Sequence, residues 1–274
     1  MGTLIKNRKG IIGLSIVFII ATTALLAPYV APYDPTQMHF QDRFSSPSSH
    51  YLLGTDFYGR DILSRIIYGY RTSLLISSLA VMIASTLGST LGIMAGYFGG
   101  QLDTLIMRTM DILFAFPVLL LAIVIVVIVG PGLVSTILAI GIVYVPIFSR
   151  IARGPTLSVK EDGYVEAAKA LGEGSFRIIL KHIIPNVSVP IFVQITISLA
   201  TAILFESSLS FLGLGTQPPN ASLGLMVSEG RNYIEISPWG TLFPGLAIAL
   251  VVLGFNLLGD GLQQILNPKL RIER

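Results

Sequence analysis

The sequence has no cysteine and little charge. Its 274 residues include 12% Asp, Glu, Lys and Arg, and three histidines. The lack of Cys excludes disulfides, thiolate metal sites and cysteine nucleophiles. The charged share is about half that of a soluble domain, whereas 53% of the residues are hydrophobic and the mean hydropathy is +0.76. Because this is more apolar surface than one core can bury, we expect an integral membrane protein.

Sequence motifs for catalysis are missing as well. No Gly-Lys-Ser/Thr occurs, so the chain lacks the phosphate-binding loop that ATP hydrolysis requires. It also has no His-Glu-x-x-His and no Gly-x-Ser-x-Gly, the patterns of zinc proteases and serine hydrolases. The net charge of +3 is too small to indicate nucleic-acid binding. We therefore expect a non-catalytic chain with no metal site and no cofactor of its own.

Stretches free of Asp, Glu, Lys and Arg predict six membrane spans, because a charge at bilayer depth is unfavourable and about 20 apolar residues cross the hydrocarbon core. The third stretch, residues 112–149, is too long for one crossing, and Gly130-Pro131-Gly132 divides it near its middle. The charge-free stretches are 10–33, 72–102, 112–149, 182–205 and 236–259. The expected fold is an all-α polytopic membrane protein with six transmembrane helices.

Basic residues predict the orientation of the spans. Lys6, Arg8 and Lys9 favour a cytoplasmic N-terminus, and alternation then fixes each later segment. On this assignment five basic residues lie outside: Arg43, Arg60, Arg65, Arg71 and Arg231. The other thirteen lie inside: Lys6, Arg8, Lys9, Arg108, Arg150, Arg153, Lys160, Lys169, Arg177, Lys181, Lys269, Arg271 and Arg274. Both termini are expected in the cytoplasm; a signal peptide at 10–27 is the less favoured alternative, because its apolar run exceeds the usual core of about 7–15 residues.

Small residues recur at every fourth position of the second span. They are Ala80, Ala84, Gly88, Gly92, Gly96 and Gly100. This spacing puts them on one helical face, where another helix can approach the backbone closely. We expect Ala84, Gly88, Gly92 and Gly96 to form a packing stripe. The partner is either another helix of this chain, which we favour, or a second membrane subunit.

Residues 150–188 form the long cytoplasmic connection. Val165, Ala168 and Leu171 share one helical face, and Gly172 suits the left-handed turn that ends a helix. An apolar face starts again at Phe176 and continues with Ile179, Leu180 and Ile183. The pattern predicts a short helix, a turn and a second helix on the inner membrane surface. Such a ridge suits insertion into a groove of a partner; the alternative is an amphipathic loop that rests on lipid headgroups.

This connection resembles the coupling loop of the permeases of binding-protein-dependent ABC importers. The resemblance is carried by Glu166-Ala167-Ala168, by Gly172 after three intervening residues, and by Pro185. His182 and Ile184 depart mildly from the family pattern, and we interpret His182 as a loop residue rather than a metal ligand. The resemblance implies that the loop docks into an ATPase subunit. The expected docking residues are Tyr164, Val165, Glu166, Ala167, Ala168, Leu171, Gly172 and Pro185.

Three further strings resemble permeases of the dipeptide, oligopeptide and nickel importers. The most specific is Leu53–Arg65, in the outer segment before the second span. Ser210–Gly215 with Gln217–Pro219 is the second, and Gly259–Leu262 with Pro268–Leu270 is the third. Within Leu53–Arg65, Asp61 can cap a helix. The resemblance covers nearly the whole chain and implies a MetI-like permease core with cytoplasmic coupling helices.

Glu206 is isolated in the fifth span, and Ser207, Ser208 and Ser210 follow it. An ionisable residue in a span normally faces a water path or a partner. We assign Glu206, Ser207 and Ser210 to the translocation path or its gate, and a structural contact near the interface is the alternative.

The sequence therefore predicts one permease subunit of an ATP-driven importer in the prokaryotic cytoplasmic membrane, most consistent with import of di- or oligopeptides. We expect two parts: 1–71, with the first span and outer segment, and 72–274, a five-helix core that includes the 150–188 loop. The resemblance implies a second permease, two cytoplasmic ABC ATPases that bind ATP and Mg²⁺, and an extracytoplasmic substrate-binding protein. The alternatives are import of nickel or another small solute, and a self-sufficient secondary carrier or channel.

Overall fold

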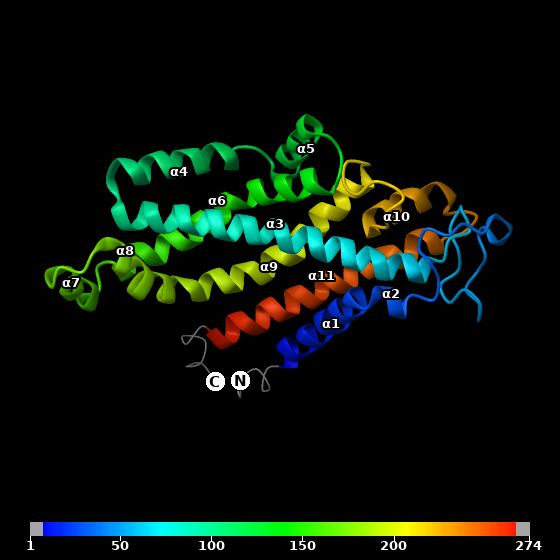
Figure 1. Cartoon of the computed structure of the whole chain (residues 1–274), viewed down its shortest axis with the longest axis horizontal. Helices are drawn as coiled ribbons and strands as arrows, with labels where there is room; N and C mark the ends of the chain where they lie inside the picture. Colours follow the sequence, from blue (N-terminus) through cyan, green and yellow to red (C-terminus); the bar gives the residue numbers. More distant parts are fainter. Residues whose placement is uncertain (1–7, 267–274) are drawn as a thin grey trace.

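The computed structural model describes residues 8–266, and every regular element in that range is a helix (Figure 1). The first half contains α1 (Arg8–Leu25), α2 (Ala27–Val30), η2 (Phe40–Asp42), α3 (Ile62–Phe98), α4 (Gly100–Phe114), α5 (Val118–Val129) and α6 (Leu133–Val159). The second half contains α7 (Gly163–Ala170), α8 (Ser175–Ile178), a π-helical turn η3 (Ile179–Ile183), α9 (Ile184–Phe211), α10 (Leu223–Gly230), η4 (Arg231–Tyr233) and α11 (Trp239–Leu266). The all-α prediction is confirmed for this range.

Five helical runs are long and apolar enough to cross a membrane. They are Arg8–Leu25, Ile62–Phe98, Leu133–Val159, Ser175–Phe211 and Trp239–Ile265. Helices α4 and α5 pass the same test only together, and they are bent by 90° relative to each other, which is the geometry of a broken span or of a re-entrant loop. Residues 8–266 therefore contain five candidate spans, or six when this bent pair is counted as one span.

The bend between α4 and α5 was not predicted. It lies at residues 115–117, where Pro117 has no N–H to donate and disfavours helical geometry at Phe116. Two charged contacts hold α4 against α6: Arg153 donates to both carboxylate oxygens of Asp103 at 2.6 Å, and Arg150 donates to Asp111 at 2.8 Å. The predicted loop at Gly130–Gly132 is confirmed between α5 and α6.

Helix α3 begins earlier than the charge-free stretch predicted. It starts at Ile62 because the Asp61 side chain accepts a hydrogen bond from the Ser64 backbone N–H at 2.8 Å, which confirms the predicted cap. The helix therefore includes Arg65 and Arg71 and runs past residue 71 without a break. A division of the chain into 1–71 and 72–274 stays a prediction.

The small-residue stripe of α3 faces α6, the helix against which α3 packs most extensively. A Cβ atom on Gly92 would overlap the Ser149 carbonyl oxygen, and one on Gly88 would lie 2.5 Å from the Val145 oxygen. The two backbones therefore touch along this face. Without a hydrophobic driving force between helices in lipid, such close packing is a main source of association.

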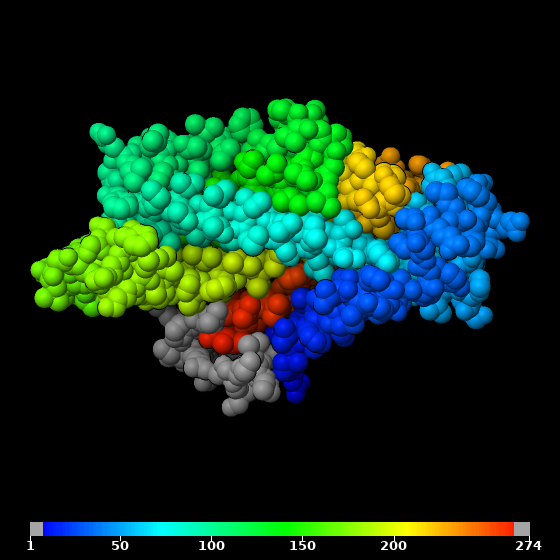
Figure 2. Space-filling view, in the orientation of Figure 1, coloured from blue at the N-terminus to red at the C-terminus, as the bar shows by residue number. Residues whose placement is uncertain are grey.

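The remaining long helices flank this pair. Helix α9 packs against α3, α6 and α11, and α1 packs along α11 (Figure 1). Ile20 and Ala24 of α1 share a buried cluster with Val251 and Phe255 of α11. The helices α7 and α8 project past the long helices at one end of the molecule, and residues 31–61 cap the opposite end (Figures 1 and 2). Part of the third family string, Pro268–Leu270, lies outside the described residues, as do Lys6, Lys269, Arg271 and Arg274.

Substitution of Gly92 tests the contact between α3 and α6. Gly92→Ala should lower the stability of the purified protein by about 1–3 kcal/mol, because the methyl group must displace the Ser149 backbone. Gly154→Ala is the matched control, since a Cβ there meets nothing within 4 Å, and it should leave stability unchanged or raise it by up to about 1 kcal/mol. Thermal unfolding in detergent measures both. Equal melting temperatures for the two variants would contradict this packing.

Candidate translocation and coupling sites

Glu206 lies in the interior of the chain, near the end of α9. Its side chain has no exposed area. Ser210 and Ser222 donate to Oε1 at 2.8 and 3.0 Å, and Ser73 donates to Oε2 at 2.7 Å. Ser207 lies further away, with its Oγ 3.5 Å from Oε2. Since a buried carboxylate needs hydrogen-bond donors in place of water, these serines account for its stable position in an apolar bundle.

The serines around Glu206 come from different parts of the fold. Ser73 belongs to α3, Ser210 to α9, and Ser222 is the residue before the first turn of α10. One carboxylate thus joins three elements that meet at this level of the bundle. Ser207 also lines an open groove of about 410 Å³ between α9 and α10. The structure therefore brings the predicted residues Glu206, Ser207 and Ser210 together and adds Ser73 and Ser222.

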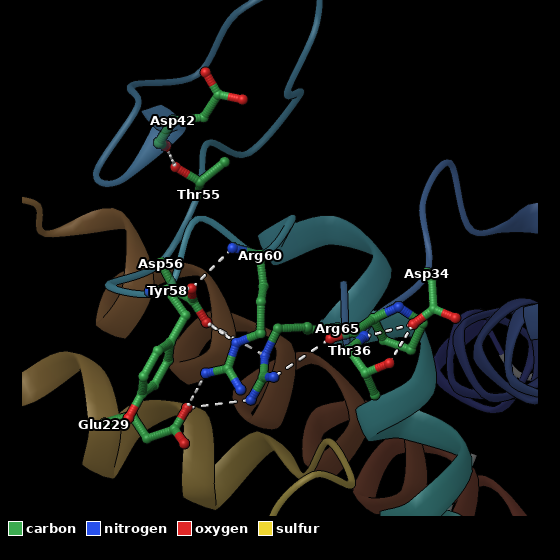
Figure 3. A network of polar contacts seen from close by, with 10 residues as sticks. Asp34, Thr36, Asp42, Thr55, Asp56, Tyr58, Arg60, Arg65 and Glu229 are labelled. Atoms are coloured by element: carbon green, nitrogen blue, oxygen red, sulfur yellow. Dashed lines mark hydrogen bonds and ion pairs between the residues drawn. The ribbon is translucent and has the colours of Figure 1, made fainter. Parts of the chain in front are cut away.

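The other end of α10 is held by a second carboxylate, Glu229, which the sequence did not single out. Arg60 and Arg65 both donate to Glu229 Oε2, at 2.8 and 3.1 Å (Figure 3). The Arg60 Nε also donates to Asp56 at 2.6 Å, and the Arg65 Nε lies 3.7 Å from the same carboxylate. The side chain of Arg65 is 1% exposed. Four charged groups thus fasten α10 to the start of α3.

The 31–61 segment is ordered by its own polar contacts. Tyr51 donates to Asp42 at 2.9 Å, and Thr55 donates to the Asp42 carbonyl oxygen. Burial and the neighbouring Asp42 carboxylate raise the pKa of Tyr51 to about 12. Hydrogen bonds from Thr36 lower the pKa of Asp34. Of the aspartates in this segment, Asp56 is the one whose side chain forms ion pairs with the arginines, Arg60 and Arg65.

The predicted coupling loop forms the projection of α7 and α8. Val165 is fully buried against Ile178, Ile183 and Val187, and so anchors the projection to the bundle. Gly172 has a φ of +83°, as its predicted turn requires, and adopts this geometry without strain. The second predicted helix does not end before Pro185. It continues through η3 into α9, because proline is tolerated in a first helical turn.

A polar cluster supports the base of this projection. His182 Nε2 lies 3.2 Å from Glu173 Oε2, and Asn186 donates to the Tyr164 hydroxyl at 3.1 Å. Partial desolvation, followed by the nearby Asp162 carboxylate, raises the pKa of Tyr164. His182 itself lies in η3, within the helical run that leads into α9. Among residues 8–266, no group of three His, Cys, Asp or Glu side chains could hold a metal ion.

Most of the predicted docking residues lie on the surface of the projection. Leu171 is 88% exposed and Phe176 is 75% exposed. Leu171 is not buried with Val165, although their spacing gives them one face, because α7 ends at Ala170. The exposed predicted residues are Tyr164, Glu166, Ala167, Leu171, Gly172 and Pro185, whereas Ala168 is half-buried. The projection of α7 and α8 therefore forms a ridge that exposes two large apolar side chains, Leu171 and Phe176.

The contact between Glu229 and the arginines is testable by neutralisation. Glu229→Gln should lower stability by about 1–3 kcal/mol, because two largely buried guanidinium groups lose a shared charged acceptor. Glu235→Gln removes an exposed carboxylate six residues away and should change stability by less than about 0.5 kcal/mol. Thermal unfolding of the two purified variants measures the difference. Indistinguishable curves would show that Glu229 does not fasten α10.

Comparison with known proteins places this architecture in one family. Residues 88–272 match the family described as the binding-protein-dependent transport system inner membrane component, and residues 2–47 match the N-terminal TM domain of oligopeptide transport permease C. The dipeptide transport system permease protein DppC of Alkalihalophilus pseudofirmus is 46% identical over 97% of this chain and 88% of its own length. The glutathione transport system permease protein GsiD of Pectobacterium atrosepticum is 44% identical over 94% of this chain and 86% of its own length.

The fold agrees with that of a solved transporter. The inward-facing MetNI methionine ABC transporter includes a chain that superposes with a TM-score of 0.61 at 18% identity, over 74% of this chain and 96% of that one. At this identity the likeness concerns the fold alone, which is the predicted MetI-like core. Together with the two sequence matches, it shows that the chain belongs to the family of binding-protein-dependent transport system inner membrane components, on the branch that has the N-terminal domain of oligopeptide transport permease C.

Proposed function

We propose that this chain is one of two membrane subunits of an ATP-driven importer for di- or oligopeptides. The proposal rests on the ridge of α7 and α8, which extends past the bundle and exposes Leu171 and Phe176 while Val165 anchors it. The relatives named for dipeptide and glutathione transport support a peptide substrate. The chain contributes half of a path, and a second, similar permease contributes the other half.

The orientation follows from the basic residues of the sequence. Both termini and the 150–188 loop lie in the cytoplasm of a prokaryotic cell, and residues 31–61 with α10 lie outside. Residues 1–71 act as an accessory part and 72–274 as the transport core, a division that the separate family matches at 2–47 and 88–272 support. ATP and Mg²⁺ are bound by the partner ATPases, and a substrate-binding protein delivers the peptide outside.

The proposed mechanism is a shift between two states. ATP binding favours closed ATPases, and the ridge transmits their movement to the bundle through the helical run from Ser175 to Phe211. This run passes from the ridge to Glu206, which contacts Ser222 at the start of α10. Movement of the ridge can therefore alter the outer end of the path, and we assign Glu206, Ser207 and Ser210 to its gate.

Gly172 tests the docking ridge. Gly172→Val should reduce ATP-dependent peptide uptake by about tenfold, because a branched residue at positive φ costs about 1–3 kcal/mol and distorts the turn between α7 and α8. Gly174→Val is the matched control, since Gly174 has a φ of −67° and open space around its Cβ position. Uptake into cells and co-purification of the ATPases are measured. Full uptake by Gly172→Val would count against docking through this ridge.

Glu206 tests the gate. Glu206→Gln should lower uptake by about tenfold while the transporter still assembles normally. The amide replaces one acceptor oxygen of the carboxylate by an NH₂ donor, and this donor faces serine hydroxyls that donate to the carboxylate in the wild type. Ser208→Ala is the control, since Ser208 is half-buried and its hydroxyl bonds only the Leu204 carbonyl oxygen within the described residues. Normal transport by assembled Glu206→Gln would remove the gate role and leave a structural one.

A further inference from the structure

The break between α4 and α5 leaves main-chain groups without hydrogen-bond partners. Among residues 8–266, the carbonyl oxygens of residues 113–116 accept no hydrogen bond, and the N–H groups of residues 116 and 118–120 donate none. Pro117, which precedes α5, has no N–H, and its side chain makes no capping bond. Residues 114–117 are exposed, so the rest of the chain does not cover them. At a helix end in water, solvent completes such hydrogen bonds.

The break lies at membrane depth. Residues 133–149 of α6 carry no charge, and they extend about 25 Å at 1.5 Å per residue, less than the roughly 30 Å of a hydrocarbon core. Leu113, in the last turn of α4, packs in one cluster with Val145 of α6. Since Val145 belongs to the uncharged stretch, the break next to Leu113 lies inside the hydrocarbon region. The residues of α5 that follow, Val118–Val129, are all apolar.

Charged side chains are exposed beside the break. The ion pair of Arg150 with Asp111 lies one turn before it, and the two side chains are 49% and 54% exposed. The Arg150 guanidinium lies 4.2 Å from the centroid of the Phe114 ring, at the edge of the break. Arg108 is also exposed and forms no ion pair within the part of the chain that the structure describes. Because charges that face lipid tails are unfavourable, this surface indicates polar surroundings.

Water accounts for these observations better than a protein neighbour does. Irregular backbone at membrane depth occurs only where protein buries it or where it lines a water-filled space, and this chain does not bury the break. A second permease would have to place donors for the free carbonyl oxygens and acceptors for the free N–H groups in fixed positions. Water molecules satisfy both kinds of group without a fixed geometry, and they solvate the pair of Asp111 and Arg150 as well.

We propose that the break between α4 and α5, residues 113–118, lines the water-filled part of the translocation path. The proposal rests on the function proposed above and adds to it a second lining element, which comes from the opposite side of the α3–α6 pair to α11. The free carbonyl and N–H groups bind water in the empty path. They offer the same bonds to the main chain of a passing peptide, whichever side chains that peptide carries.

The lack of native cysteine makes a labelling experiment specific. Phe116→Cys and Ala115→Cys each place one thiol at the break, on exposed residues, and the second is the smaller change. Phe18→Cys is the matched control, because Phe18 is 67% exposed on α1, within an unbroken helix. Each variant is assembled with its partner subunits in inside-out membrane vesicles. The labelling rate with a hydrophilic, membrane-impermeant maleimide is measured with and without ATP and vanadate.

Without nucleotide, the two-state mechanism opens the path to the cytoplasmic side, which the reagent reaches. The thiols at 115 and 116 should then react at least about tenfold faster than the thiol at 18, because a thiol reacts as its thiolate and needs water. Rates at both positions as low as at 18 would show that lipid or a partner subunit covers the break, and would overturn the proposal.

The nucleotide arm separates a path from a hydrated membrane surface. ATP with vanadate holds the ATPases closed and turns the path away from the cytoplasm, so labelling at 115 and 116 should fall at least about fivefold. Equally fast labelling in both states would place the break at the membrane surface and would also overturn the proposal.

Uptake of labelled peptide into intact cells is measured for the wild type and for both variants at the break. A wild type that accumulates no peptide would contradict the proposed function, whatever the labelling rates. Normal peptide uptake together with slow labelling at 115 and 116 would contradict only the assignment of the break to the path.

Discussion

The continuous helical run from Ser175 to Phe211 is the constraint on which the rest of the structure depends. It begins in the α7–α8 projection and ends beside Glu206. At about 1.5 Å per residue, Ile178 and Glu206 are separated by about 40 Å along this run. The run includes the π-helical turn η3 and Pro190, but it is unbroken, so a displacement at its first turn can be passed along it to the carboxylate near its end. The two regions assigned to coupling and gating are therefore mechanically connected within one chain.

The neighbouring helices are packed closely on one another. The backbones of α3 and α6 touch at Gly88 and Gly92. The backbones of α10 and α9 touch as well, because a Cβ atom on Gly224 would overlap the Ser207 carbonyl oxygen. Helix α10 is also held by polar contacts, at Ser222 to Glu206 and at Glu229 to the arginines. A movement of the end of α9 is therefore transmitted to α10 by both kinds of contact.

Much of this arrangement could be predicted because it is encoded locally. The loop at Gly130–Gly132, the cap at Asp61 and the turn at Gly172 each depend on the geometry of a few consecutive residues. The small-residue stripe follows from helical periodicity alone, although its partner α6 could not be identified from spacing. The bend between α4 and α5 was missed although Pro117 marks it in the sequence, because Pro117 lies in a long apolar stretch that was divided only at Gly130–Gly132. The contact of Glu229 with Arg60 and Arg65 has no local sequence pattern, since it joins residues more than 160 positions apart. Of the four serines around Glu206, Ser207 and Ser210 could be predicted because they follow Glu206 in the sequence. Ser73 and Ser222 could not, because they lie in other elements.

The central claim is that the chain forms half of the transport path and that separate ATPase subunits supply the energy for transport. Transport of a labelled dipeptide into proteoliposomes tests this most directly, with both permeases and the binding protein present, and with or without the ATPase subunits and ATP. The account predicts concentrative uptake only when the ATPases and ATP are supplied. Accumulation against a gradient by the permeases alone would contradict it.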